Sequence, residues 1–125
     1  MASELVGRFM SAVQAFERSG EPAVLLTLFD EDCEAVVMGR TEPARGLREV
    51  EAFWRDYLSG FRGVQTGFTH VVEGDGGAVL EWVARGALAS GEPVQLKGVT
   101  VLELEQGKVR RLRGYHDSAV RRFST

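Results

Sequence analysis

The 125-residue chain is 44% hydrophobic and 26% charged and carries a formal net charge of −3 at pH 7, which predicts one globular domain spanning residues 1–125. No apolar run approaches the ~20 residues of a membrane span, and the acidic balance gives no electrostatic reason to expect nucleic acid. The single cysteine, Cys33, excludes an internal disulfide and a cysteine-cluster metal site. The N-terminal segment lacks the features of a signal peptide, so together with the single cysteine it predicts a cytoplasmic protein. We expect neither a membrane nor a nucleic-acid partner.

Three helices are predicted in the first half of the chain. In the first, apolar side chains recur every three or four residues until Gly20, which ends the helix. Pro22 suits a first helical turn and predicts a short second helix over Ala23 to Phe29. The third helix begins at Leu47, presents a broad aromatic face that includes Phe61, and is closed by Gly60 and Gly63.

Strand patterns account for most of the remaining chain. After the acidic turn formed by residues 30–32, Cys33 to Met38 is apolar and β-branched, and a loop is predicted over residues 39–46. Phe68 to Glu73 and Ala78 to Ala89 are predicted strands joined by a turn of glycines and aspartate. Together with the helices, these segments predict an α+β fold.

The longest unambiguous pattern runs from Pro93 to Asp117 and predicts a β-hairpin. Gln106 and Gly107 have the chemistry of a tight two-residue turn. Such a turn predicts four facing pairs, which are Glu105 with Lys108, Leu104 with Val109, Leu102 with Arg111, and Thr100 with Arg113. Three helices cannot cover both faces of so long a sheet, so we expect the sheet to curl around them into a cone that can hold a pocket.

The order of these elements and three local strings resemble the nuclear transport factor 2-like superfamily, which includes ketosteroid isomerases and SnoaL-like polyketide cyclases. The strings are LLTLFDEDCEAVV, EPARGLREVEAFW and GKVRRLRGYHD, and the resemblance covers roughly Val6 to Val120. It implies a curved mixed or antiparallel sheet wrapped around three helices, a ligand cavity inside the cone, and a homodimer formed through the convex face of the sheet.

The residues that carry out ketosteroid isomerisation in this superfamily are replaced. Where the resemblance would place the general-base aspartate the chain has Val37, and the two oxyanion-hole donors correspond to Val13 and Thr100. That mechanism requires a carboxylate base and acidic donors in an apolar site. The carboxylate that epoxide hydrolases of this superfamily carry on the last strand corresponds to Gly114, so neither reaction is expected.

The direction in which strand side chains face can be predicted from the turns. If Asp75 and Gly76 form a two-residue loop, the facing pairs share one face of the sheet and are Glu81 with His70, Val83 with Phe68, and Arg85 with Thr66. The resemblance implies that this is the concave face, which also carries Gly98, Thr100, Leu112, Gly114 and His116. A bulge would reverse part of this assignment, because a shift of one residue changes the face of every side chain beyond it.

His116 is the leading catalytic candidate and His70 the second, because an imidazole can donate or accept a proton near neutral pH. The alternative for each is a histidine satisfied by the backbone, and the alternative for Glu81 and Arg85 is an exposed strand pair. Pairing from the hairpin turn sets His116 opposite Lys97, whereas the resemblance places it in the cavity. We expect a bulge to bring it to the cavity wall, since strongly curled strands commonly carry bulges.

The remaining predicted ligand-pocket residues combine the aromatic face of the third helix with concave-face positions of the strands. They are Val37, Met38, Phe53, Trp54, Tyr57, Phe68, Glu81, Val83, Arg85, Thr100, Leu112 and Gly114. Trp82 and Leu80 are predicted on the convex face with Val99 and Val101, where the four would be covered by a second copy of the chain. No metal or cofactor is expected.

Two functions remain open from the sequence. The first is a protein that binds a small hydrophobic or aromatic molecule and acts on it as an acid/base lyase, isomerase or cyclase. The second is a non-catalytic dimeric module that binds a ligand or a partner. Buried ionisable groups converging on an open cavity would favour the first, and a cavity collapsed around Trp54 and Phe68 would favour the second.

Overall fold

The computed structural model describes residues 2–38 and 42–117, within which the chain forms three helices and a six-stranded sheet. Positions 39–41 of the predicted loop, and the part of the predicted resemblance beyond Asp117, lie outside these residues. The helices are α1 (Ala2–Ser19), α2 (Ala23–Leu26) and α3 (Gly46–Ser59). None of the described helices is long and apolar enough to cross a membrane.

The helices begin and end close to the predicted positions, with two corrections. Gly20 ends α1 with φ +77°, and its N–H donates to the Phe16 carbonyl at 2.7 Å, as expected of a glycine after a helix. The helix α2 is shorter than predicted, because Phe29 pairs with Val109 and belongs to a strand. The aromatic residue Phe61 was wrongly predicted in the third helix, because α3 ends at Ser59 and Phe61 is the first residue of a strand.

The strands are β1 (Phe29–Val37), β2 (Ala44–Arg45), β3 (Phe61–Gly74), β4 (Gly77–Leu88), β5 (Pro93–Glu105) and β6 (Lys108–His116). Their order in the sheet is β2-β1-β6-β5-β4-β3, with β1 parallel to β6 and every other neighbouring pair antiparallel. The predicted α+β cone with a mixed sheet is therefore confirmed. The short strand β2 was not predicted.

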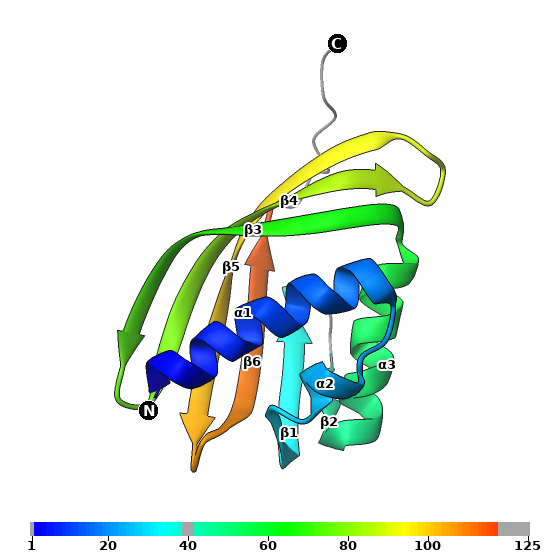
Figure 1. Ribbon diagram of the computed structural model, residues 1–125. Coiled ribbons are helices and arrows are strands. Elements are labelled where there is room, and N and C mark those ends of the chain that lie inside the picture. The colour runs from blue at the N-terminus through cyan, green and yellow to red at the C-terminus, as the bar shows by residue number, and fades with distance from the viewer. Residues whose placement is uncertain (1, 39–41, 118–125) are drawn as a thin grey trace.

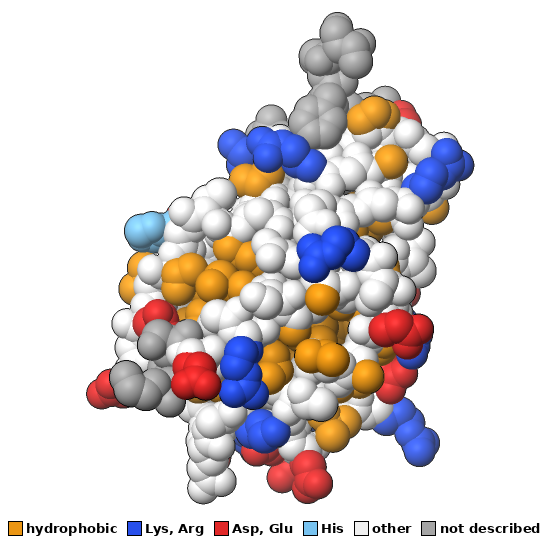
Figure 2. All heavy atoms as spheres, viewed as in Figure 1, with side chains coloured by type: hydrophobic (Ala, Val, Ile, Leu, Met, Phe, Trp, Pro, Cys, Tyr) orange, Lys and Arg blue, Asp and Glu red, His pale blue; other side chains and the backbone are white. Residues whose placement is uncertain are grey.

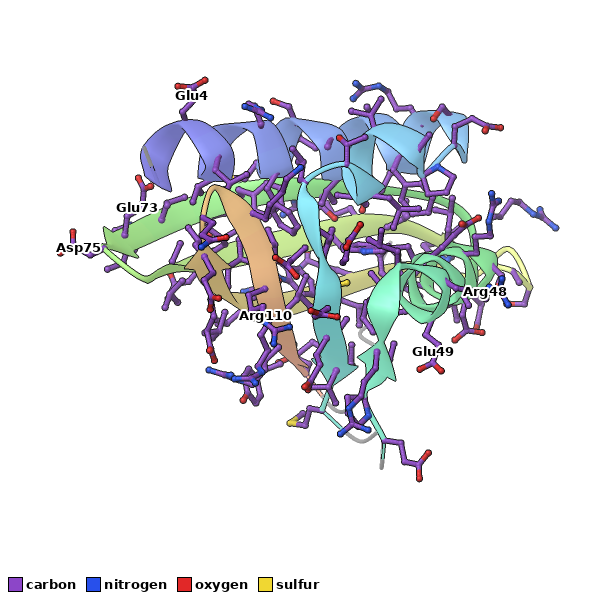
Figure 3. The ribbon with its side chains drawn as sticks, turned by 90° about the horizontal axis from the view of Figure 1, so that it is seen from below. Glu4, Arg48, Glu49, Glu73, Asp75 and Arg110 are labelled. Carbon is purple, nitrogen blue, oxygen red and sulfur yellow. The ribbon has the colours of Figure 1, made fainter. Side chains whose placement is uncertain are left out.

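The long strands curve, and α1 lies across their concave side while α3 lies beside β1 and β2 (Figure 1). The core fills the space between the helices and this concave face, with Phe9 and Phe16 of α1 packed among Leu80, Leu102 and Val109 of the strands. Figure 2 shows hydrophobic side chains reaching the surface in patches beside α1, with charged side chains scattered around them. Viewed from below, the labelled Glu4 and Arg48 point away from this core (Figure 3).

Two of the bulges in the sheet change which of the predicted site residues face the inside of the cone. In the β3–β4 pair the register shifts between Phe68 and His70, so that Thr69 is the extra residue. In the β5–β6 pair the shift lies between Glu103 and Leu104, and Arg110 is the extra residue. The Arg110 guanidinium donates a hydrogen bond to the Asp32 backbone carbonyl, which ties this bulge to β1.

The bulges correct several predicted pairings. The hairpin pairs nearest the turn are as predicted, but Leu102 faces Leu112 and Thr100 faces Gly114 instead of the two arginines. On β4, Leu80 is fully buried and Trp82 faces the concave side, so both were wrongly predicted on the convex face. The convex residues of β4 alternate with them and are Val79, Glu81, Val83 and Arg85.

An ion-pair network crosses four strands on the convex face. Glu34 of β1 lies 3.8 Å from Arg45 of β2 and 3.9 Å from Arg111 of β6. Glu103 of β5 pairs with Arg111 at 3.0 Å and also with Arg113. Hydrogen bonding by Arg113, with Arg111 adding to it, holds the pKa of the Glu103 carboxyl below its ordinary value of 4.5.

We predict that Glu103→Gln lowers the free energy of unfolding at pH 7 by roughly 0.5 kcal/mol, after allowance for solvent screening of this exposed network. The pKa of Glu103 is lower in the folded state, so its contribution is full above the unfolded-state pKa and is lost as pH falls through the folded-state pKa. Urea unfolding at several pH values should therefore show the full deficit at pH 7 and a progressively smaller deficit as the pH falls below the ordinary pKa of 4.5.

Glu105→Gln is the matched control, because Glu105 lies two residues further along β5 and forms no ion pair with the described residues. A deficit for Glu103→Gln that is unchanged between pH 7 and pH 3 would contradict the prediction.

Candidate functional site

A cavity of about 300 Å³ lies between the concave face of the sheet, α1 and α3. Its described lining is mainly apolar and aromatic, with polar groups at a few positions. The lining residues are Phe9, Val13, Val37, Phe53, Trp54, Asp56, Tyr57, Phe61, Thr66, Phe68, Trp82, Leu96, Thr100, Leu112, Gly114 and His116. Its volume and mainly apolar wall suit a compact organic molecule.

The strand wall of the cavity is a row of neighbours across four strands. Phe68 faces Trp82, Trp82 faces Gly98, and Gly98 faces His116. A Cβ on Gly98 would collide with the Trp82 ring and with the Tyr115 carbonyl, so only glycine allows the indole to lie this close to β5. The Trp82 indole N–H donates to the Thr100 hydroxyl at 2.9 Å, which fixes the ring in the wall.

His116 lines the cavity and is half-buried. Because Arg110 is an extra residue in β6, His116 faces Gly98 and not Lys97, and its side chain shares the concave face with Thr100 and Gly114. The His116 Nδ1 lies 2.7 Å from the Asp117 backbone carbonyl, which can only accept, so Nδ1 carries the hydrogen. In the neutral ring Nε2 is therefore the acceptor.

A second polar group lies behind the cavity wall at Glu17 of α1, which is only 8% exposed. Glu17 Oε1 accepts the Thr66 backbone N–H at 2.8 Å, and Oε2 accepts the Thr66 hydroxyl at 2.6 Å. Oε2 also accepts the Tyr57 hydroxyl at 2.9 Å. All three donors come from two residues that line the cavity, Thr66 and Tyr57.

The same contacts close the free edge of the sheet. β3 is an edge strand, and the Thr66 N–H and carbonyl are both satisfied by α1, the carbonyl by the Gln14 side-chain amide at 2.9 Å. Gln14 and Glu17 are three residues apart and so share one helix face. An unpaired strand edge is thereby covered without another strand.

Burial raises the pKa of the Tyr57 phenol, and the neighbouring Glu17 carboxylate raises it further. Tyr57 is therefore a neutral phenol that gives its hydrogen to Glu17. Its oxygen lone pairs remain as acceptors beside the cavity.

Trp54 forms the base of the aromatic wall. Its ring makes edge-to-face contacts with five rings, those of Phe9, Phe16, Phe29, Phe53 and Tyr57, at centroid distances between 5.6 and 6.5 Å. Its buried indole N–H has no hydrogen-bond partner among the described residues. These contacts make the end of the cavity rigid and apolar.

The structure brings many of the predicted pocket residues to the cavity. Those in the wall are Val37, Phe53, Trp54, Tyr57, Phe68, Thr100, Leu112, Gly114 and His116. Val13, at the position of an oxyanion donor in the isomerases, also lies there. The binding and catalytic roles of these residues remain predictions.

Five predicted site residues lie elsewhere. His70, Glu81 and Arg85 are exposed, and Val83 shares their convex face; Met38 is 48% exposed after the end of β1. His70 does face Glu81 as predicted, but the extra Thr69 reverses the face between His70 and Phe68. Arg85 donates instead to Gln95 at 2.9 Å on the convex side.

The sequence interpretation missed Glu17, although a signal was present. Glu17 lies four residues after Val13, so it falls on the apolar stripe of α1, where an acid must find a buried partner. Trp82 was missed because it was predicted on the convex face of the sheet, without the bulge at Thr69.

Residues 6–112 match the SnoaL-like domain family. The chain belongs to the SnoaL-like family. No match to a curated protein was found. Solved structures share its fold at low sequence identity, and those named below show the fold alone.

An NTF2-like protein of Anabaena variabilis has a TM-score of 0.86 and 16% identity over 94% of this chain and 90% of that one. A candidate SnoaL-like polyketide cyclase of Jannaschia has a TM-score of 0.83 and 19% identity over 93% and 85% of the two chains. A protein of Catenulispora acidiphila with a ketosteroid isomerase-like fold, solved in complex with trimethylamine, has a TM-score of 0.76 and 18% identity over 88% and 85%. The resemblance to the nuclear transport factor 2-like superfamily predicted from sequence is thus confirmed.

We predict that the Tyr57 phenol stays protonated well above pH 10, the ordinary midpoint of tyrosine. The chain has two tyrosines, so Tyr115→Phe leaves Tyr57 as the sole source of tyrosinate absorbance. Alkaline titration of this variant, with folding followed by circular dichroism, should show tyrosinate only as the protein unfolds. A Tyr57→Phe/Tyr115→Phe double variant supplies the baseline, and a midpoint near 10 in folded protein would contradict the prediction.

Proposed function

We propose that this SnoaL-like protein binds a compact hydrophobic or aromatic molecule in its cavity and transfers a proton to or from it, as an acid/base lyase, isomerase or cyclase. The observation that carries the proposal is the open cavity of about 300 Å³ with the His116 ring in its wall. The bond from Nδ1 to the Asp117 carbonyl holds the ring in the tautomer whose Nε2 can accept a proton.

The open cavity favours this proposal over a non-catalytic module. Trp54 and Phe68 leave the space between them and His116 unfilled, and the Glu17–Tyr57–Thr66 group adds buried polar contacts at the same wall. The trimethylamine bound by the Catenulispora relative supports a cavity that encloses a small organic molecule. The buried cysteine supports the proposal of a reducing, cytoplasmic location.

Steroid isomerisation through a carboxylate base is not part of the proposal. Val13, Val37 and Thr100 line the cavity, so valines stand where an oxyanion donor and the base would be required. Loss of one oxyanion donor alone typically costs roughly 3 to 4 kcal/mol of transition-state stabilisation. The proposal assigns proton transfer to His116, whose ring lies in the cavity wall.

We predict that 2-tetralone, a neutral bicyclic ketone, quenches tryptophan fluorescence on binding, because both tryptophans of the chain line the cavity. Proton NMR in deuterated buffer should show exchange of its α-hydrogens above the buffer rate. His116→Gln should retain binding and lower the exchange rate by about 100-fold or to background, the usual effect of losing a general base.

His70→Gln is the matched control, because His70 is an exposed histidine outside the cavity. Binding without catalysed exchange in the wild-type protein would favour the non-catalytic module. Exchange that survives His116→Gln would contradict the role of His116.

We further propose that the protein is a homodimer through the convex face of the sheet. Val79 and Tyr115 on this face are 37% and 43% exposed, and Val99 and Val101 lie between them. The face also carries Glu81 and Lys97, so two copies related by a two-fold axis can bring the acid of one to the base of the other. This surface replaces the one predicted with Trp82 and Leu80.

Val99→Glu should shift the dimer toward monomer, because it adds a carboxylate to the middle of the proposed apolar interface. Val24→Glu is the control, since Val24 is 68% exposed on α2, away from this face. Analytical ultracentrifugation at micromolar concentration tests both variants. A 13.7 kDa species for the wild-type chain would contradict the dimer.

A further inference from the structure

We propose that the cavity prefers a ligand with a positive charge, a compact hydrophobic amine or alkylammonium ion, and that Glu17 is the residue that sets this preference. The inference rests on the proposed binding function and names the ligand class for the same cavity. It is carried by the charge and the aromatic surface around the cavity.

Glu17 places a negative charge directly behind the wall. Its two oxygens are held by Thr66 and Tyr57, both of which line the cavity, and it forms no ion pair with any described residue. A carboxylate with hydrogen-bond donors but no cation leaves a net negative field in its surroundings. That field acts strongly inside the protein because the interior screens charge less than water does.

The hydrogen-bonding groups at the cavity wall favour a cation as well, because they are acceptors. Tyr57 gives its hydrogen to Glu17 and His116 gives its Nδ1 hydrogen to Asp117, so the phenol oxygen and the neutral imidazole Nε2 are both acceptors. The described lining includes the acidic Asp56 and no lysine or arginine. An anionic ligand would therefore meet acceptors and carboxylates without a balancing cation.

The aromatic surface favours a cation in a second way. Seven of the described lining residues are aromatic, from Phe9 on α1 to Trp82 on β4. A cation within about 6 Å of an aromatic ring face is attracted by the ring quadrupole, most strongly by tryptophan, and the attraction increases when water is excluded. The 300 Å³ volume limits such a ligand to a compact amine.

Three probes with one aromatic ring and different charge test the proposal, namely benzylamine (cation), benzyl alcohol (neutral) and benzoate (anion). Their affinities are measured at pH 7 by calorimetry and by quenching of tryptophan fluorescence. The wild-type protein should bind benzylamine about tenfold tighter than benzyl alcohol, and benzoate most weakly. Glu17→Gln should lower the ratio of benzylamine to benzyl alcohol affinity about tenfold, the effect of one charge at a partly screened distance.

Glutamine can keep hydrogen bonds to Thr66 and Tyr57, so Glu17→Gln removes charge with little change in shape. The matched control is Glu4→Gln on the same helix, where the exposed Glu4 points away from the sheet (Figure 3) and pairs with Arg8 at 3.8 Å. This control should leave the ratio unchanged. If Glu17→Gln does not fold, two other measurements test the proposal. The first is the order of the three probe affinities in the wild-type protein. The second is the ratio of benzylamine to benzyl alcohol affinity in Asp56→Asn, which should fall about twofold.

Benzoate binding as tight as benzylamine would overturn the proposal, as would an unchanged ratio in folded Glu17→Gln. If benzyl alcohol binds but charge has no effect, only this inference fails. If none of the three probes nor 2-tetralone binds, the proposed binding function itself fails.

Discussion

The contacts of the Glu17 carboxylate hold the fold together around its cavity. They join α1 to α3 through Tyr57 and α1 to the edge strand β3 through Thr66, three elements that are far apart in the sequence. Removing the carboxylate would leave a buried backbone N–H and two hydroxyls in need of partners, which typically costs about 1 to 3 kcal/mol for each unsatisfied group. The Glu17 side chain therefore couples α1, α3 and the free edge of the sheet at the cavity wall.

The sequence predicted the architecture because its helices and turns are local features. The apolar stripe of α1, the aromatic face of α3 and the turns at Asp75-Gly76 and Gln106-Gly107 each depend on residues close together in the chain. The face on which each strand side chain lies could not be predicted in this way, since it depends on the bulges at Thr69 and Arg110. No local pattern marks either bulge, which is why His70 and Glu81 were assigned to the wrong face while His116 was placed through resemblance.

The candidate site was predicted in part for the same reason. Side chains on α3, such as Trp54 and Tyr57, could be assigned from helical period alone. Glu17 could be recognised only by asking why an acid interrupts an apolar stripe, and its partner Thr66 lies 49 residues away. The replacement of an isomerase oxyanion donor by Val13 and of the base by Val37 was predicted from sequence. Both valines line the cavity, so the wall lacks those two groups.

The central claim is that the cavity encloses a small molecule in contact with His116. The most direct measurement is a crystal structure of the protein as purified, and again after soaking with 2-tetralone. The account predicts ligand density between Trp54, Trp82 and His116, with a ligand atom within hydrogen-bond distance of His116 Nε2. Side chains that close the cavity, with only solvent outside it in both crystals, would contradict the account.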